Sequence, residues 1–136
     1  MFDIDEKDKT IYLTRGDMAT IIVNARNANR RYTFRGGDVV RFRITNKGNY
    51  NDVRFTKDVT VKEETQNVEI TLDREETKLD EITNREKEYW YEIELNPDTA
   101  PQTIVGFDKD GAKKLILYPE GGDLKWVMAQ LKLKTN

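Results

Sequence analysis

Apolar and polar residues alternate with a period of two along most of the chain. Successive side chains of a β-strand point to opposite faces, so each alternating segment has one apolar face and one hydrated face. Sheets with such faces pack against each other and bury their apolar sides. The pattern therefore predicts an all-β protein, a single antiparallel β-sandwich of seven or eight strands. The alternating segments are residues 11–13, 21–23, 40–45, 53–61, 68–72, 89–95, 103–107 and 113–118.

Two segments depart from this alternation. Residues 73–78 follow a strand with an acidic first turn, which predicts one short helix between the sheets. The segment 121–136 carries apolar residues at helical spacing, but Leu131 and Leu133 alternate with lysines and also fit a strand. We favour a short helix or an arm for this segment. Residues 108–111 are instead a strong hairpin signal between the last two short strands.

The chain of 136 residues has the size of one ordinary domain. No Pro-, Gly- or Ser-rich linker, internal repeat or low-complexity segment divides it, so we expect one domain over residues 1–136. Residues 1–10 and 121–136 are expected to serve as flexible or partner-contacting arms. The alternation also predicts a core that includes Val40, Phe42, Ile70, Tyr91, Ile93 and Leu115.

The sequence contains no Cys, no His and no Ser. This excludes disulfides, thiolate and imidazole metal sites, and the Ser–His and Cys–His nucleophile pairs of common hydrolases. We therefore expect no enzymatic activity, no cofactor and no metal. A carboxylate enzyme is a third alternative, because Glu92 and Glu94 share one strand face, although a hydrated acidic face explains them more simply. Asp108 and Asp110 match part of a calcium loop but lack its spacing, and turn chemistry explains them.

The first residues alternate in charge and contain no apolar stretch, so we expect no signal peptide. The longest apolar runs have four residues, whereas a membrane-spanning helix needs about 20. Synthesis and folding in a cytoplasm, without membrane contact, are expected.

Charge is unevenly distributed, although the net charge is only −2. Residues 1–62 hold 13 Lys and Arg against 8 Asp and Glu, a net of +5. Residues 63–136 hold 10 against 17, a net of −7. Opposite patches on one molecule are complementary head to tail and favour rings or stacks of identical subunits. We therefore expect self-association.

The densest basic stretch interleaves arginines with Tyr32 and Phe34. Arginines beside aromatic side chains on a β-surface suit single-stranded nucleic acid, through phosphate pairing and base stacking. The simpler interpretation is that these arginines face solvent and pair across strands with acidic residues. Nucleic-acid binding is kept as the alternative function. The candidate basic patch consists of Arg26, Arg30, Arg31, Arg35, Arg41 and Arg43.

Trp90 falls on the acidic face of its strand by alternation, opposite to Tyr89 and Tyr91. A tryptophan in this position is covered either by the chain itself or by a partner. An exposed tryptophan beside charged residues is a good interface anchor. We therefore take Trp90, Glu92 and Glu94 as a candidate partner interface.

Two glycine-containing turns are predicted. Arg15-Gly16-Asp17 lies between two strands, where Gly supplies backbone freedom and Asp supplies a side-chain acceptor. It also matches a cell-adhesion tripeptide, but a turn is sufficient to explain it. Gly37 and Asp38 precede a strong strand, so we expect a positive φ at a glycine and capping of backbone amides by Asp38.

A series of short motifs occurs in a recognisable order. The sequence reads LTRGD at residues 13–17, TI at 20–21, YTF at 32–34 and GDVVRF at 37–42. Later it reads YWYEIEL at 89–95, GFD at 106–108 and LYPEG at 117–121. Together these motifs resemble the N-terminal domains of phage baseplate upper proteins and related small virion proteins of prophages in Gram-positive bacteria. The resemblance spans roughly residues 11–121.

The resemblance implies an immunoglobulin-like β-sandwich that docks in a virion, in the tail or baseplate. Such a module would act as a scaffold or adaptor without catalytic residues, and its partners would be other virion proteins and copies of itself. Baseplate upper proteins continue into a helical stalk or receptor-binding region, whereas this sequence stops at residue 136. Met18 also replaces the small polar residue that is common at that position. Host-receptor binding is therefore not carried over.

Overall fold

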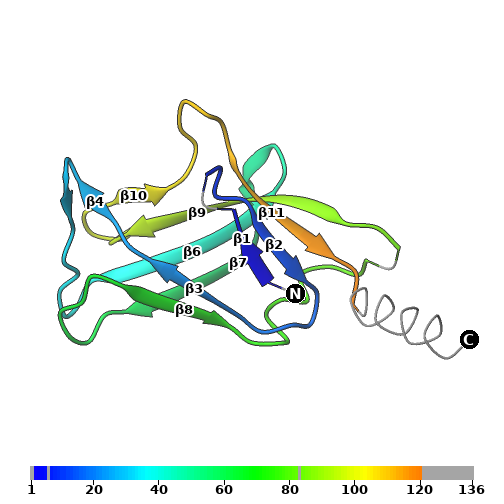
Figure 1. Cartoon of the computed structure of the whole chain (residues 1–136), viewed down its shortest axis with the longest axis horizontal. Helices are drawn as coiled ribbons and strands as arrows, with labels where there is room; N and C mark the ends of the chain where they lie inside the picture. The colour runs from blue at the N-terminus through cyan, green and yellow to red at the C-terminus, as the bar shows by residue number, and fades with distance from the viewer. Residues whose placement is uncertain (1, 6, 83, 121–136) are drawn as a thin grey trace, which may run out of the picture.

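The computed structural model describes residues 2–5, 7–82 and 84–120. These residues form eleven strands and contain no helix, so the expectation of an all-β protein is confirmed (Figure 1). Eleven exceeds the seven or eight strands expected, because strands of two or three residues are too short for alternation to be visible. The strands are β1 (Phe2–Ile4), β2 (Ile11–Thr14), β3 (Ala19–Val23), β4 (Arg26–Asn27), β5 (Arg30–Arg31), β6 (Val39–Asn46), β7 (Asn49–Thr60), β8 (Val68–Leu72), β9 (Lys87–Leu95), β10 (Gln102–Val105) and β11 (Lys113–Tyr118).

The strands form one large sheet and two small ones. The large sheet has the order β1-β2-β11-β9-β6-β7, and β10 also pairs with β9. The small sheets are β3 with β8 and β4 with β5. All of these pairs are antiparallel except β2 with β11, which run parallel with Ile11 opposite Leu115. The antiparallel prediction is wrong for this pair, because side chains alternate in the same way in both kinds of pairing.

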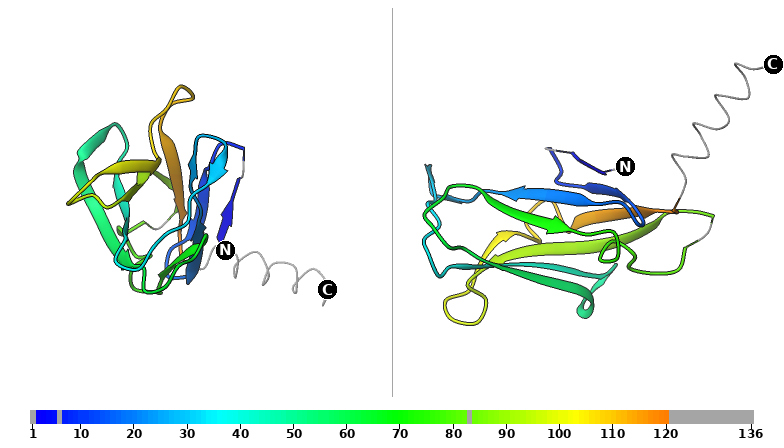
Figure 2. Two further views of the ribbon diagram at one scale, coloured as in Figure 1. Left: turned by 90° about the vertical axis from the view of Figure 1, so that its left-hand side faces the viewer. Right: turned by 90° about the horizontal axis from the view of Figure 1, so that it is seen from below.

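The β3–β8 sheet lies against one face of the large sheet (Figure 2). Every second residue of β3, β8 and β9 is buried. The buried residues of both sheets belong to one apolar cluster, which forms the core. The predicted core is confirmed, since exposure is 3% or less for each of Val40, Phe42, Ile70, Tyr91, Ile93 and Leu115.

Lys57 interrupts the inward-facing side of β7, and contacts with the second sheet explain its position. Its Nζ donates hydrogen bonds to the carbonyl oxygen of Thr71 at 2.7 Å and to Glu76 Oε1 at 2.8 Å. Thr71 belongs to β8, and Glu76 belongs to the turn that follows β8. Lys57 therefore connects the edge of the large sheet to the second sheet through charge-assisted hydrogen bonds.

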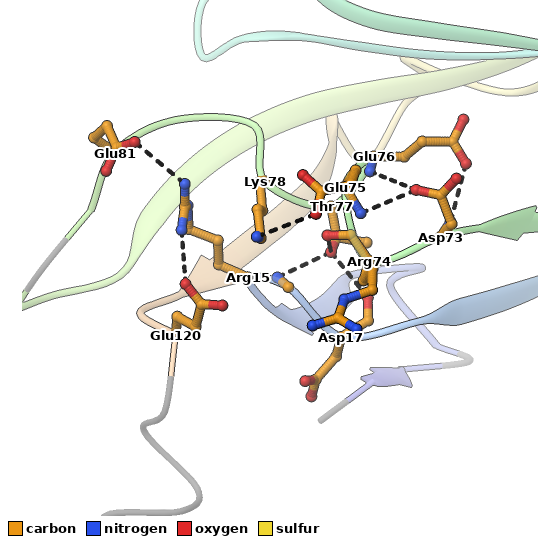
Figure 3. Close-up of polar contacts among 11 residues, drawn as sticks. Arg15, Asp17, Asp73, Arg74, Glu75, Glu76, Thr77, Lys78, Glu81 and Glu120 are labelled. Carbon is orange, nitrogen blue, oxygen red and sulfur yellow. Dashed lines mark hydrogen bonds and ion pairs between the residues drawn. The ribbon is translucent and has the colours of Figure 1, made fainter.

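Residues 73–78 form a hydrogen-bonded turn instead of the predicted helix (Figure 3). Asp73 Oδ1 accepts hydrogen bonds from the N–H groups of Glu75 and Glu76, at 2.9 and 2.8 Å, and Glu76 Oε1 accepts one from the N–H of Asp73. This is the capping arrangement of a helix start. The helix does not continue, because Thr77 is buried and its hydroxyl is engaged by the backbone of the turn after β2.

The N-terminal segment contributes to the large sheet. Residues 2–4, which lie in the segment expected to be an arm, form β1, and Phe2 lies opposite Leu13 of β2. The Tyr91 hydroxyl donates a hydrogen bond to the carbonyl oxygen of Lys9 at 2.6 Å, which ties the turn after β1 to β9. The other expected arm, residues 121–136, lies outside the described residues.

The turn before β6 has the geometry predicted for Gly37 and Asp38. Gly37 has a φ of 96°. Asp38 Oδ2 accepts hydrogen bonds from the N–H of Arg35 at 3.0 Å and from the hydroxyl of Tyr32 at 2.9 Å. Asp38 Oδ1 accepts a third one from Asn96 Nδ2 at 3.1 Å, just after β9. One carboxylate therefore holds the turn and joins it to the neighbouring strand.

Gly37→Val should destabilise the protein by about 1–3 kcal/mol, because a β-branched residue is strained at this φ. Beyond its chain neighbours, no atom lies within 4 Å of a Cβ built at Gly37, so the loss reports backbone strain without a clash. Gly37→Asn is the matched control and should cost clearly less, because Asn tolerates the left-handed region. Urea unfolding measures both changes, and a neutral Gly37→Val would contradict the strain.

Candidate functional site

Arg41 and Arg43, on β6, do not form a free basic surface. Arg41 binds Asp58 of β7 through Nε–Oδ1 at 2.8 Å and Nη2–Oδ2 at 2.9 Å, and it also pairs with Asp98 at 3.0 Å. Arg43 forms an ion pair with Glu92, which lies opposite it on β9. The hydrogen bond with Arg41 lowers the pKa of Asp58 below its ordinary value. These two arginines serve as cross-strand ties, so the structure divides the predicted patch.

The other four arginines of the predicted patch gather on and beside the β4–β5 hairpin. Arg26 lies directly opposite Arg31 across the hairpin. All four side chains are exposed, and none forms an ion pair with a carboxylate among the described residues. A hollow of about 630 Å³ beside the hairpin is lined in part by Tyr32 and Asp38. We call Arg26, Arg30, Arg31 and Arg35 the arginine hairpin.

The aromatic residues near the arginine hairpin are already engaged. Tyr32 packs edge-on against Phe34, with ring centroids 5.1 Å apart, and its hydroxyl is bound to Asp38. Burial and the bond to Asp38 raise the pKa of Tyr32 above its ordinary value of 10. Phe34 is fully buried. The nucleic-acid alternative required bases to stack on these two rings. Phe34 offers no open ring face, and the Tyr32 ring is half-buried.

Trp90 is half-buried on the outer face of β9, and other parts of the chain provide its cover. Tyr50 of β7 packs against it at a centroid distance of 5.2 Å, and Phe107, in the loop after β10, approaches edge-on at 6.4 Å. Phe107 itself is 64% exposed. We call Tyr50, Trp90 and Phe107 the aromatic surface. Its exposed member is Phe107, which the predicted strand 103–107 included; β10 ends at Val105, and Phe107 lies in the loop that follows.

Charged and polar groups lie around and beneath the aromatic surface. The side chain of Glu92 is only 16% exposed, and its partner Arg43 is 28% exposed. Burial and the nearby charge of Glu92 raise the pKa of Tyr50. Glu94 is half-buried on the same strand face. The structure therefore places the predicted residues Trp90, Glu92 and Glu94 together, but Glu92 is committed to Arg43 and is not a free carboxylate.

The Arg15-Gly16-Asp17 turn is held in place by hydrogen bonds to the segment after β8 (Figure 3). Gly16 has a φ of 87°, and its N–H donates a hydrogen bond to Thr77 Oγ1 at 3.0 Å. The same hydroxyl donates to the carbonyl oxygen of Asp17 at 2.9 Å. A Cβ at Gly16 would lie 2.7 Å from Glu120 Oε1. The turn connects β2 of the large sheet to β3 of the second sheet, so it fixes where the chain changes layers.

Arg15 is only 12% exposed, which removes the guanidinium that an adhesion tripeptide presents. Its Nε donates a hydrogen bond to the carbonyl oxygen of Asp80 at 2.8 Å. Its Nη1 pairs with Glu120 at 2.9 Å, and its Nη2 with Glu81 at 3.4 Å. The arginine therefore ties the end of β2 to the segment after β8 and to the segment after β11. These contacts support the predicted turn role.

Asp80 is the centre of a polar network that neither alternation nor motif analysis identified. Its carboxylate accepts hydrogen bonds from Arg54 at 2.6 Å, from Lys87 at 2.9 Å and from the Tyr89 hydroxyl. Burial acts to raise the pKa of Asp80, but the bonds from Lys87 and Tyr89 outweigh it and hold the pKa below the ordinary 3.8. Burial and Asp80 also raise the pKa of Tyr89.

Asp80→Asn should destabilise the protein at neutral pH by about 1–3 kcal/mol, through the loss of charge-assisted hydrogen bonds. A carboxylate with a lowered folded pKa stabilises the fold above its unfolded pKa, and this stability is lost as the pH falls through the folded pKa. The wild type should therefore lose stability more steeply than the variant below about pH 4. Urea unfolding from pH 7 to pH 3 tests this. Asp110→Asn, an exposed carboxylate with the same charge change, should leave the profile of the wild type unchanged.

The acidic residues of the predicted turn at 108–111 form contacts within and beside that turn. Asp108 pairs with Lys113 at 2.8 Å and accepts a hydrogen bond from the N–H of Asp110 at 2.9 Å, as expected of a turn. The predicted hairpin is wrong, because the strands on either side of this turn, β10 and β11, both pair with β9 and not with each other. Among the described residues, no group of three or more acidic side chains is placed to hold a metal ion. No helix in the described part of the chain is long and apolar enough to cross a membrane. No protein-family model and no curated protein matches the sequence.

Proposed function

We propose that this protein is a non-enzymatic structural module of a phage virion, a scaffold or adaptor in the tail or baseplate. The observation that carries the proposal is the position of the resemblance motifs in the fold. Residues 13–17 contain the turn that moves the chain between the two sheets, and residues 37–42 contain the turn locked by Asp38. These motifs stabilise turns of the fold, which suits a structural protein that acts through its surface.

An immunoglobulin-like arrangement is part of this proposal. Two features support it: the two facing sheets share one core, and the chain passes between them at the Arg15-Gly16-Asp17 turn. The parallel pairing of β2 with β11 is compatible with such a sandwich, since an N-terminal strand that changes sheets can pair alongside the last strand.

The proposed partner contact is the aromatic surface. Exposed aromatic side chains surrounded by charge are typical centres of protein interfaces. Phe107 is the proposed anchor, because Trp90 is already held between Tyr50 and Phe107. Glu94, together with the Arg43–Glu92 pair, would form the polar rim of such a contact. The partner is another virion protein or a second copy of this chain.

Phage particles produced by a strain that encodes this chain should contain it in stoichiometric amounts, which mass spectrometry of purified particles measures. Phe107→Ala should lower incorporation about 30-fold or more, because an interface anchor contributes about 2 kcal/mol or more. Met18→Ala is the matched control, since Met18 is equally exposed at 65% and lies away from the aromatic surface. Absence of the wild-type protein from particles would contradict the virion role. Equal incorporation of both variants would contradict the contact.

Self-association through the same surface is tested by light scattering of the purified protein. The average mass should rise with concentration in 0.1 M salt and fall in 1 M salt, because the Debye length shrinks from about 10 Å to about 3 Å. Phe107→Ala should scatter as a monomer, while Met18→Ala should behave as the wild type. A wild type that stays monomeric at both salt concentrations would remove self-association and leave other virion proteins as the partners.

A further inference from the structure

The arginine hairpin brings four positive charges together, and the one carboxylate that lines the hollow beside it, Asp38, is hydrogen-bonded to Tyr32 and Asn96. Arg26 and Arg31 face each other across a two-stranded antiparallel pair, where directly opposite side chains lie about 5 Å apart and like charges repel. The connecting turn contains Ala28 at a φ of 57°, a region that Ala adopts only at an energetic cost. Both features disfavour the isolated hairpin. An anion bound between the arginines would relieve the first of them.

Most other arginines in the described structure form ion pairs with carboxylates. Elsewhere in the described residues, the arginines that lie over the sheets or at their ends are paired with carboxylates. These paired arginines are Arg15, Arg41, Arg43 and Arg54. The described unpaired arginines outside the hairpin, Arg74 and Arg85, lie in two separate loops and form no cluster. The arginine hairpin is therefore the place in the described structure where several guanidinium groups gather without an ion pair to a carboxylate.

The surroundings of the hairpin favour a nucleic acid over a protein as the anion. A protein interface needs an apolar centre that excludes water. The large apolar side chains that are exposed in the described structure all lie on other segments, at Met18, Ile22, Val53 and Phe107. A surface of charge alone matches a phosphate backbone, which attracts arginines through closely spaced charges and released counterions.

The engaged aromatic residues decide which part of the nucleic acid is recognised. Phe34 is fully buried, and the Tyr32 ring is packed against it with its hydroxyl bound to Asp38. Stacking of single-stranded bases needs open ring faces. Contacts to phosphate oxygens need none and carry no sequence information. Recognition should therefore depend on charge and not on base identity.

From these observations we propose that the arginine hairpin binds the phosphate backbone of nucleic acid, without base stacking or sequence preference. The proposal does not depend on the virion role. With up to four phosphate contacts, the slope of log affinity against log salt on duplex DNA should reach about −3.6, so affinity should fall about 100-fold between 50 and 200 mM salt. Single-stranded and duplex DNA of one sequence should bind with similar affinities.

Fluorescence anisotropy of a labelled 20-nucleotide DNA, single-stranded and as a duplex, tests the proposal with the full chain. The double variant Arg30→Gln/Arg31→Gln should lose at least about tenfold in affinity at 50 mM salt, and its salt slope should fall by about 2. Arg74→Gln/Arg85→Gln removes the same charge from two exposed, unpaired arginines outside the hairpin. The affinity of this control for DNA should stay within about twofold of the wild type. The comparison therefore distinguishes an effect of the arginine hairpin from an effect of net charge.

A third variant separates loss of binding from loss of folding. Arg31→Glu places an acidic side chain opposite Arg26, so it should abolish binding while the melting temperature stays the same or rises. Three results would overturn the proposal: no binding by the wild type at 50 mM salt, equal losses in the Gln variant and its control, or a strong preference for single strands. Competition by poly-L-glutamate as effective as that by DNA, at equal charge, would instead assign the hairpin to an acidic protein surface.

Discussion

The arrangement of the two sheets depends on the contacts of Arg15. This side chain binds the backbone of Asp80 and the carboxylates of Glu81 and Glu120, so it joins segments that come before β3, after β8 and after β11. Next to it, the Thr77 hydroxyl fixes the turn at which the chain leaves the large sheet. Together with the hydrogen bonds of Lys57 to Thr71 and Glu76, these polar contacts give β3 and β8 one position against the large sheet, which apolar packing alone does not specify.

Charge pairing across strands is the second constraint on the fold. A chain with 35% charged residues has few apolar groups to bury, and the outer faces of its sheets must accommodate many charges. Arg41 with Asp58, Arg43 with Glu92 and Lys57 with Glu76 place opposite charges on neighbouring strands or at their ends. Exposed pairs of this kind contribute little stability each, but they favour one strand register over its alternatives. The network around Asp80 does the same at the start of β9.

In most of the described structure, charged groups are paired and large apolar groups are buried, but two surfaces are exceptions. At the aromatic surface, Phe107 stays largely exposed beside Trp90. At the arginine hairpin, Arg26 and Arg31 face each other, and none of the four arginines forms an ion pair with a carboxylate among the described residues. The two surfaces have different chemistry, one apolar with a charged rim and one dominated by arginines. A single ligand would not satisfy both, which is why we assign them to different partners.

The sequence by itself determined the class of the fold, most of its core and the chemistry of its turns. Alternation placed Phe42, Tyr91 and Leu115 in the core, because the period of two reports which strand face is apolar. The glycines at 16 and 37 indicated their turns because only a residue without a side chain adopts their φ readily.

Tertiary structure alone decided that β2 and β11 run parallel, since alternation is the same for both strand directions. It also decided that residues 73–78 form a turn and not the expected helix. The side chains of Asp73 and Glu76 form the hydrogen bonds of a helix start, but Thr77 is buried and bound to the turn after β2. Only the fold divided six arginines into two paired ones and four unpaired ones, because a charge is matched by its neighbours in space and not by its neighbours in the chain.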